Sequence, residues 1–386
     1  MYVVKHRSEL RLSSFIFVSI ILVVGWNITP AHAHCAGNHT GDHPHCVGGG
    51  GGGGVGSIDP AIVYRLGSNI AISNADGSSQ IVVVANNASN INPSWSPDGK
   101  NIIFTSDLNG LGIYRIKIDR TNGQVLSGPE KLVDVNVFPL SSKPVWSPER
   151  FSDGQYRIAY VDTDPDTGFQ SLFLLAVDDN GTPLGQAILL RDVSGSDFPN
   201  KVFPSWSPNE KQLVVTAYRG APPWSPYYDL QTVALDDCGA GSSVCEVLPE
   251  SLNVATSICP EDTCNFYPAW GNTGAAIAVV RSVDAGNGIY IIPVSDPQAF
   301  YKLPGTDGRY AYWPSWSPID DKIIARMRLS PCNTIKGNIY AAIIARTTYG
   351  LGNGPGTCTA EEEKVLIKDK SLFTSEWWRN HGKVLP

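Results

Sequence analysis

The stretch Pro93-Ser94-Trp95-Ser96-Pro97-Asp98-Gly99 decides the fold, because near-copies of it recur along the 386-residue chain. The copies centre on tryptophans spaced 46 to 64 residues apart: Trp95, Trp146, Trp206, Trp270, Trp316 and, in a degraded form, Trp377. This spacing is about the length of one four-stranded β-propeller blade with variable loops. A large indole ring suits packing between blades, Ser-Pro suits a bend, and Asp-Gly tolerates positive φ. We therefore assign these tryptophans a structural role.

Runs rich in Ile, Val and Tyr follow the tryptophans and are bounded by Gly, Pro and Asp. Runs of this length and composition are typical of β-strands, and no stretch shows a sustained helical period. We expect strands over residues 101–105, 113–118, 212–216, 230–235, 276–280, 289–294, 322–326 and 338–344.

The two ends of the repeat region complement each other. Residues 61–65, 69–73 and 80–84 resemble a blade without its opening phrase, and residues 376–386 resemble an opening phrase without its blade. Together they complete one blade, in which we expect residues 383–386 to pair. Closing the ring in this way removes exposed strand edges. The sequence therefore predicts an all-β, six-bladed β-propeller closed by strands from both termini.

Two segments resemble a known family. Residues 95–104, Trp-Ser-Pro-Asp-Gly-Lys-Asn-Ile-Ile-Phe, and residues 69–77, Asn-Ile-Ala-Ile-Ser-Asn-Ala-Asp-Gly, are similar to the WD-type repeat of TolB-like six-bladed propellers. The resemblance covers residues 58–386 and implies an exported propeller that binds other proteins. It transfers no catalytic residue. TolB itself also carries an N-terminal α/β domain, which we do not expect in this chain.

The first 33 residues have the pattern of a signal peptide. Lys5, Arg7 and Arg11 give a positive start, residues 15–26 an apolar core, and Ala31-His32-Ala33 a cleavage site. The apolar run is short for a membrane span, so we expect no stable span after cleavage. We expect a periplasmic or secreted protein; a retained anchor is the alternative.

Residues 34–57 form a histidine- and cysteine-containing tail that ends in a glycine-rich linker, with seven consecutive glycines at 48–54. Glycine-rich chain behaves as a flexible tether, so the propeller is expected to begin at residue 58. The formal net charge of −7 and the lack of a basic stripe exclude nucleic acid as an expected partner.

Eight cysteines follow the cleavage site, which is consistent with an oxidising compartment. Their spacing predicts three local disulfides and a fourth that rests on parity alone: Cys35–Cys46, Cys238–Cys245, Cys259–Cys264 and Cys332–Cys358.

Histidine usage bears most directly on catalysis. None of the seven histidines lies between Ile58 and Asn380, so a serine–histidine nucleophile pair or a histidine-bound metal cannot form inside the propeller. We therefore expect a non-enzymatic scaffold that binds a protein partner in the cell envelope. The alternative is a carbohydrate- or peptide-processing enzyme that uses carboxylates in the channel.

Two loops are candidate partner-binding segments. The loop 162–168 carries Asp162, Asp164 and Asp166 in a calcium-like pattern, but its glycine comes one place late and Phe173 stands where a glutamate is expected. A solvated hairpin tip is therefore favoured over a calcium site.

The second loop, at residues 219–228, carries Trp224, Tyr227 and Tyr228. These residues either anchor a partner, or cap a neighbouring blade or plug the channel mouth. We expect these two loops to share one face with those at residues 107, 284–288 and 329–336.

The tail has the highest density of metal ligands. His34, His39, His43 and His45 lie within twelve residues, and cleavage after Ala33 would give His34 a free amine. An amine and several imidazoles suit copper or another divalent transition metal. A disordered polar leader is the alternative.

Overall fold

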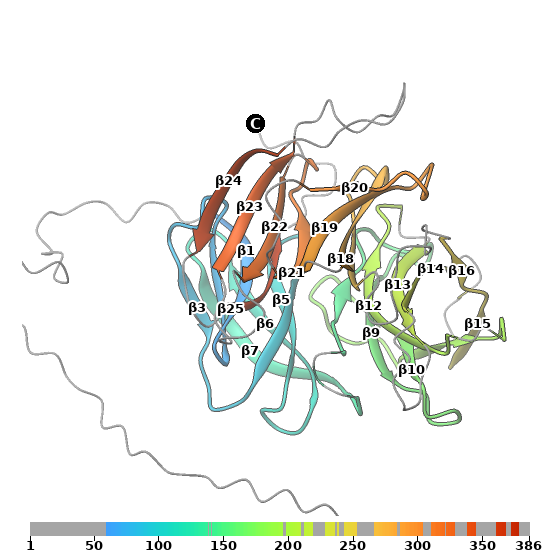
Figure 1. Cartoon of the computed structure of the whole chain (residues 1–386). Helices are drawn as coiled ribbons and strands as arrows, with labels where there is room; N and C mark the ends of the chain where they lie inside the picture. Colours follow the sequence, from blue (N-terminus) through green and yellow to red (C-terminus); the bar gives the residue numbers. More distant parts are fainter. Residues whose placement is uncertain are drawn as a thin grey trace, which may run out of the picture. The chain divides into compact units, whose positions relative to one another are not determined.

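The computed structural model describes residues 59–137, 139, 141–195, 198–209, 212–218, 228–235, 238, 243–252, 266–283, 286–303, 310–320, 322–328, 338–344, 360–367 and 372–377. Every regular element within these ranges is a β-strand (Figure 1). No helix there is long and apolar enough to cross a membrane.

The described strands form six sheets, each built from strands that are hydrogen-bonded in the order of naming. One sheet combines the two ends of the described chain: β25 (Leu372–Trp377), β1 (Pro60–Leu66), β2 (Asn69–Asn74) and β3 (Ile81–Val84). The next comprises β4 (Asn90–Trp95), β5 (Asn101–Ser106), β6 (Gly112–Asp119) and β7 (Gln124–Asp134). A five-stranded sheet contains β15 (Val244–Val247), β11 (Ile188–Asp192), β10 (Gln170–Val177), β9 (Tyr156–Thr163) and β8 (Val145–Trp146).

The other three sheets follow the same plan. They are β12 (Asn200–Trp206), β13 (Gln212–Tyr218), β14 (Tyr228–Ala234) and β16 (Glu250–Ser251); β17 (Phe266–Trp270), β18 (Ala276–Val283), β19 (Gly286–Pro293) and β20 (Tyr301–Lys302); and β21 (Tyr310–Trp316), β22 (Lys322–Arg328), β23 (Asn338–Ile344) and β24 (Ala360–Ile367).

The first strands of the sheets close a ring. Each contacts the next in the order β4, β8, β12, β17, β21, β25 and back to β4. β25 pairs antiparallel with β1, where Ile62 faces Trp377 and Tyr64 faces Ser375; Figure 1 shows the red strand beside the blue one. The predicted β-propeller closed by strands from both termini is confirmed. The expected pairing of residues 383–386 lies outside the described residues.

The predicted strands are observed, with ends that differ by a few residues. The tryptophan phrase itself forms the end of each first strand, which the sequence pattern did not indicate. The long strand β7 was also missed, because its residues are mostly polar and include Gly128-Pro129. It forms the outer edge of its sheet, and its N-terminal half is exposed to solvent.

The described phrase tryptophans lie between sheets. Their side chains are at most 6% exposed: Trp95, Trp146, Trp206, Trp270 and Trp316. Trp206 shares a hydrophobic cluster with β9, β10 and β11, and Trp316 does so with β18 and β19, in each case the preceding sheet. Their indole N–H groups donate across the same boundary, to the carbonyl oxygens of Val145 at 3.1 Å and Ala269 at 2.9 Å. These tryptophans therefore join neighbouring blades.

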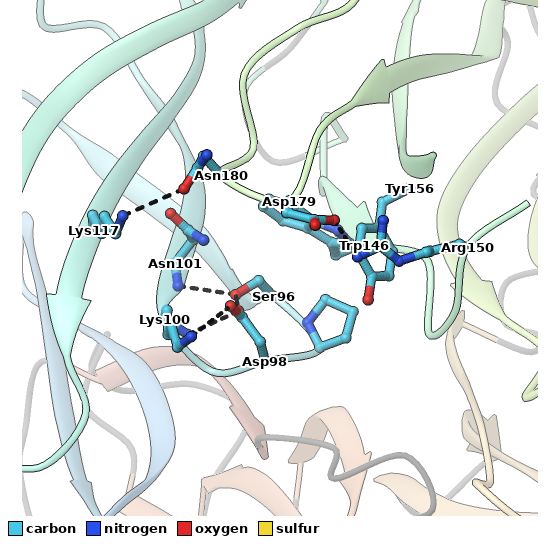
Figure 2. Close-up of a pocket in the computed structure, with 11 residues that line it drawn as sticks. Ser96, Asp98, Lys100, Asn101, Lys117, Trp146, Arg150, Tyr156, Asp179 and Asn180 are labelled. Atoms are coloured by element: carbon cyan, nitrogen blue, oxygen red, sulfur yellow. Dashed lines mark hydrogen bonds and ion pairs between the residues drawn. The ribbon is translucent and has the colours of Figure 1, made fainter. Parts of the chain in front are cut away.

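The turn that follows Trp95 shows why the phrase contains Ser and Asp. The Ser96 hydroxyl donates to Asp98 Oδ1 at 2.6 Å and accepts from the Asn101 amide at 2.9 Å (Figure 2). Gly99 has φ +67°, a conformation that favours glycine. The phrase therefore encodes both the end of one strand and the start of the next.

Two of the phrases depart from this pattern together. In the β21–β22 turn, Asp320 takes the position of the glycine, with φ +55°. Its carboxylate reaches the β17–β18 turn, where it accepts from the Asn272 amide at 2.8 Å and the Thr273 amide at 2.7 Å, and from both of their side chains. A Cβ on Gly271 would lie 2.9 Å from Asp320 Oδ2. Glycine therefore replaces serine at 271 because a carboxylate from the next blade occupies the space.

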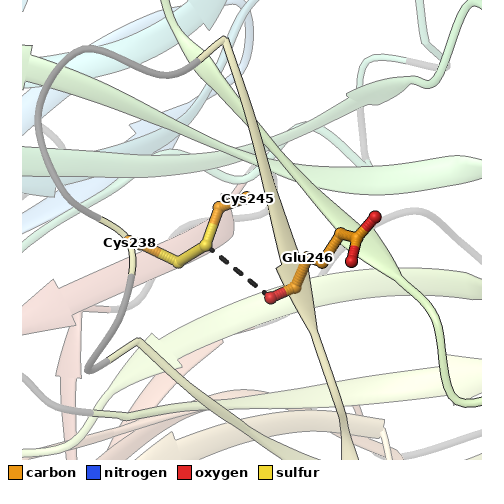
Figure 3. The surroundings of a disulfide bond; sticks show 3 residues. All are labelled: Cys238, Cys245 and Glu246. Atoms are coloured by element: carbon orange, nitrogen blue, oxygen red, sulfur yellow. Dashed lines mark hydrogen bonds between the residues drawn. A yellow bond between two sulfur atoms is a disulfide. The ribbon is translucent and has the colours of Figure 1, made fainter.

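The disulfide Cys238–Cys245 anchors a strand shared between blades (Figure 3). Its Cα atoms lie 5.5 Å apart. Cys245 lies on β15, which follows β14 in sequence but pairs in parallel with β11 of the preceding sheet. The predicted pairing of Cys238 with Cys245 is therefore present. The pairs Cys35–Cys46, Cys259–Cys264 and Cys332–Cys358 lie outside the described residues and stay predictions.

We expect the double variant Cys238→Ser/Cys245→Ser to lose about 2–3 kcal/mol of unfolding free energy, because the unfolded chain regains the freedom of a short closed loop. Guanidinium unfolding of both proteins measures the difference. Reducing the wild type should give the same loss and leave the variant unchanged. Equal stabilities would show that β15 holds its place without the covalent link.

Candidate partner-binding face

The connections between the second and third strands of the sheets meet at one end of the ring, which we call the hairpin face. They include β5–β6 and β9–β10, two of the connections expected from the sequence; the β13–β14 connection, residues 219–227, lies outside the described residues. The predicted loop 284–288 is wrong in extent, because Gly286–Gly288 belong to β19 and Val283 pairs with Gly286. The loop 329–336 lies outside the described residues.

The carboxylates of the predicted calcium-like loop are already in use within the fold. Asp164 Oδ1 accepts from the Asp166 amide at 2.9 Å, and Asp164 Oδ2 accepts from the Thr167 hydroxyl at 2.9 Å. Arg191 forms ion pairs with both Asp164 and Asp166. These contacts stabilise a tight hairpin tip. The described residues contain no group of three or more His, Cys, Asp or Glu that could hold a metal ion.

Asp162 lies at the base of the same hairpin. Its Oδ1 accepts from the Asn136 amide at 2.6 Å and from the Thr163 amide at 2.7 Å. Burial raises the pKa of its carboxyl group, and these two hydrogen bonds oppose that shift. Asp162 therefore ties the hairpin to the segment that follows β7. Whether a partner contacts any of the three aspartates stays a prediction.

The predicted aromatic anchors are described only in part. Trp224 and Tyr227, like the tail ligands His34, His39, His43 and His45, lie outside the described residues. Tyr228 begins β14 and is half-buried. Its ring lies 4.4 Å from that of Phe266 and 5.6 Å from that of Tyr218, centroid to centroid. Tyr228 therefore contacts the neighbouring blade as well as its own hairpin.

Aromatic side chains continue from Tyr228 along the first strands of three consecutive sheets. The Phe203 and Tyr267 rings lie 4.5 Å apart, and the Tyr267 and Trp313 rings 5.0 Å apart. Tyr228 joins this series through Phe266, whose ring is 6.0 Å from that of Tyr267. We call these five residues the inner aromatic cluster. It crosses from the ring of first strands to the hairpin face.

A repeated backbone feature places three of these side chains. Phe203, Tyr267 and Trp313 each precede the proline of a tryptophan phrase and have φ of +55°, +53° and +50°. The strand register shifts at each of these positions, as in a β-bulge. Such a conformation costs on the order of 1–3 kcal/mol for a residue other than glycine, and bulges redirect side chains. Asn92 has the same geometry at φ +52°, so this backbone conformation does not itself require an aromatic residue.

The cluster is neutral and borders a cation. Burial raises the pKa values of the cluster residues Tyr228 and Tyr267, and raises that of the adjacent Tyr218 to about 12, so these phenols stay protonated at neutral pH. The Arg326 guanidinium lies 5.9 Å from the centroid of the Trp313 ring. Trp313 and Arg326 are buried, at 8% and 5% exposure, whereas the half-buried rings of the cluster suit contact with apolar or aromatic side chains of a partner. The five cluster residues themselves include no carboxylate pair and no histidine.

Sequence reasoning found Tyr228 and missed the other four members. Three of these four had a signal in the residue type before a proline: Phe203, Tyr267 and Trp313, against Asn92 and Lys143 in two other blades. Which way these side chains point depends on the bulge, which the sequence pattern did not reveal.

Solved structures, but not sequence comparisons, reveal relatives of this fold. No protein-family model matches the sequence, and no curated protein matches it. The chain is similar to a TolB-type protein from Agrobacterium tumefaciens, with a TM-score of 0.51 and 16% identity, over 82% of this chain and 92% of that one. TolB from Acinetobacter baumannii gives a TM-score of 0.51 and 17% identity, over 83% and 66% of the two chains.

A chain of the nidogen–laminin complex is similar to the same degree, with a TM-score of 0.50 and 10% identity over 83% of this chain and 99% of that one. At these identities the likeness shows the fold. The fold is a TolB-like β-propeller.

Proposed function

We propose that this chain is an exported, non-enzymatic propeller scaffold that binds a protein of the cell envelope or a secreted protein at its hairpin face. The inner aromatic cluster carries the proposal, because it brings Phe203, Tyr267 and Trp313 together from three blades and extends through Tyr228 to the loops. Aromatic residues dominate the binding energy of protein interfaces. One of the similar structures is itself a complex of two proteins.

Export is supported by the signal-peptide pattern of residues 1–33 and by a disulfide in the propeller. A binding role is supported by the chemistry of the cluster, whose rings stay neutral beside the Arg326 guanidinium. Copper binding by His34, His39, His43 and His45 is a separate proposal that rests on the sequence of the tail.

We expect the triple variant Trp224→Ala/Tyr227→Ala/Tyr228→Ala to bind the partner at least tenfold more weakly, since central aromatic anchors contribute about 2 kcal/mol or more. The partner is first captured from an envelope extract on the immobilised wild-type chain, and its dissociation constant is then measured with purified protein. Equal affinity of wild type and variant would place the binding site elsewhere.

Because Tyr228 packs on Phe266, the variants also need a stability control. Thermal melting separates loss of binding from loss of fold, and Tyr228→Phe should keep both the packing and the affinity. Leu126→Ala is the matched control, since Leu126 is 55% exposed and lies near the β6–β7 turn, at the other end of the ring from the hairpin face. It should leave binding unchanged.

A further inference from the structure

Five Asn-Gly sequences occur in this chain. Such pairs are the most reactive sites for loss of a side-chain amide, because glycine has no Cβ to hinder attack by its own backbone nitrogen. Asn287-Gly288 lies within β19, and Asn353-Gly354 lies outside the described residues. The other three lie in described turns: Asn109-Gly110, Asn122-Gly123 and Asn180-Gly181. Since these three share a sequence, their surroundings decide which of them reacts.

The reaction at an Asn-Gly pair needs two groups that are free to move. The glycine backbone nitrogen attacks Cγ of the asparagine and closes a five-membered succinimide ring, and its proton leaves with the side-chain nitrogen as ammonia. Water then opens the ring at either carbonyl, which leaves aspartate or isoaspartate. A hydrogen bond that holds the glycine N–H or the asparagine side-chain amide must break before the ring can close, so each such bond slows the reaction.

The glycine amide is held in two of the three turns. The Gly123 amide donates to the Asp119 carbonyl oxygen at 2.7 Å, and the Gly181 amide donates to the Asp178 carbonyl oxygen at 2.9 Å. Both of these glycines are buried. Gly110 is exposed, and its amide has no acceptor among the described residues. Of the three glycine nitrogens, that of Gly110 is therefore the one that can attack without first breaking a hydrogen bond.

The asparagine side chains follow the same division. Asn122 Oδ1 accepts from the Gln124 amide at 2.8 Å, and Asn180 Oδ1 accepts from Lys117 Nζ at 3.4 Å (Figure 2). Asn109 is exposed, and within the described part of the chain its side-chain amide makes no hydrogen bond. The Asn109 side chain can therefore turn toward the next backbone nitrogen without losing a contact.

A cation lies beside this reactive backbone. Lys131 Nζ donates to the Asn109 carbonyl oxygen at 2.6 Å, and a Cβ on Gly110 would lie 3.3 Å from the same nitrogen. An ammonium group in this position stabilises the negative charge that develops as the Gly110 amide loses its proton. The ion pair of Lys131 with Asp134, at 2.8 Å, holds the ammonium group in place and offsets part of its charge.

We propose that Asn109 is a site of spontaneous deamidation in the folded protein, where it converts to aspartate and isoaspartate through a succinimide with Gly110. The site lies in the β5–β6 loop of the hairpin face. Its product adds a carboxylate next to the Lys131–Asp134 ion pair, and the isoaspartate form also lengthens the main chain by one carbon atom. The charge of this face therefore changes slowly and irreversibly with the age of the molecule, whether or not a partner binds there.

The test incubates the full processed chain near neutral pH and follows each Asn-Gly peptide by mass spectrometry, after digestion in mild acid to prevent further reaction. Asn109 should convert at least about tenfold faster than Asn122 and Asn180, because one or two hydrogen bonds broken before ring closure correspond to about that change in rate. The other two pairs serve as internal controls. In the chain unfolded by denaturant, the three rates should become similar, since the turns no longer protect Asn122 and Asn180.

A pair of variants tests the part played by the neighbouring cation. Lys131→Gln should slow conversion of Asn109 by about threefold or more, because the developing negative charge loses its ammonium partner. Lys117→Gln, beside Asn180, is the matched control and should leave the rate at Asn109 unchanged. Equal rates at the three turns of the folded wild type would overturn the proposal. So would earlier conversion of Asn122 or Asn180, or an Asn109 that stays intact while the unfolded chain converts.

Discussion

Removal of residues 372–386 should abolish the cooperatively folded state of the propeller. The deletion removes β25, which pairs with β1 and also contacts β4 and β21. Without it the ring has two open edges, and the buried residues Ile62 and Tyr64 of β1 lose their neighbouring strand. The loss should be comparable with the whole stability of a domain, about 5–15 kcal/mol. Near-ultraviolet circular dichroism and thermal melting measure it.

A shorter deletion serves as the control. Removing only residues 378–386 keeps β25 and should leave the melting transition close to that of the full chain. If the shorter deletion were as damaging as the longer one, the closing contact would lie beyond Trp377, as the sequence alone suggested. A cooperative melting transition in the longer deletion would show that five complete sheets and the three strands β1 to β3 are enough for cooperative folding.

The Asp320→Ala variant should lose about 2–3 kcal/mol of unfolding free energy. The substitution leaves four donors on Asn272 and Thr273 without their carboxylate, and hydrogen bonds to charged groups contribute about 1.5–3 kcal/mol each when water does not replace them. Asp98→Ala in another blade is the control. Asp98 accepts from Ser96 and Lys100 of its own turn, so its loss should cost less than about 1 kcal/mol.

The same contact makes a second substitution non-additive. Gly271→Ser should destabilise the wild type, because its Cβ would meet Asp320 Oδ2 at 2.9 Å. In the Asp320→Ala variant that space is empty. The loss of unfolding free energy caused by Gly271→Ser should therefore be smaller there by about 1 kcal/mol or more. Denaturant unfolding of the four proteins in the cycle gives this coupling. Simple additivity would mean that the two turns do not act on each other.

The architecture could be predicted from the sequence because the segment that forms the first strand of each sheet is repeated along the chain. A tryptophan phrase that recurs at blade-length intervals marks each first strand, and the complementary ends mark the closing sheet. Contacts that occur only once could not be predicted in this way. Neither the parallel pairing of β15 with β11 nor the reach of Asp320 to Thr273 follows from any periodic pattern, since each depends on how two neighbouring blades meet.

The candidate site was predictable only at its edge. Tyr228 was found because its loop is long and rich in aromatic residues, whereas Phe203, Tyr267 and Trp313 stand directly beside the structural phrase and share its pattern. Their proximity follows from positive φ values before proline, a backbone state that the preference of that position for extended conformations argues against.

The pairing of Ile62 with Trp377 also has a kinetic meaning. These residues come from opposite ends of the described chain, so their contact has nearly the largest sequence separation available to it. The entropic cost of closing such a loop grows only slowly with its length, by about 0.6 kcal/mol for each doubling. The large sequence separation therefore adds only modestly to the free energy of closing the ring. Folding rates nevertheless fall as contacts become less local. We therefore expect the two end strands to pair late in folding, in the step that makes the ring a single cooperative unit.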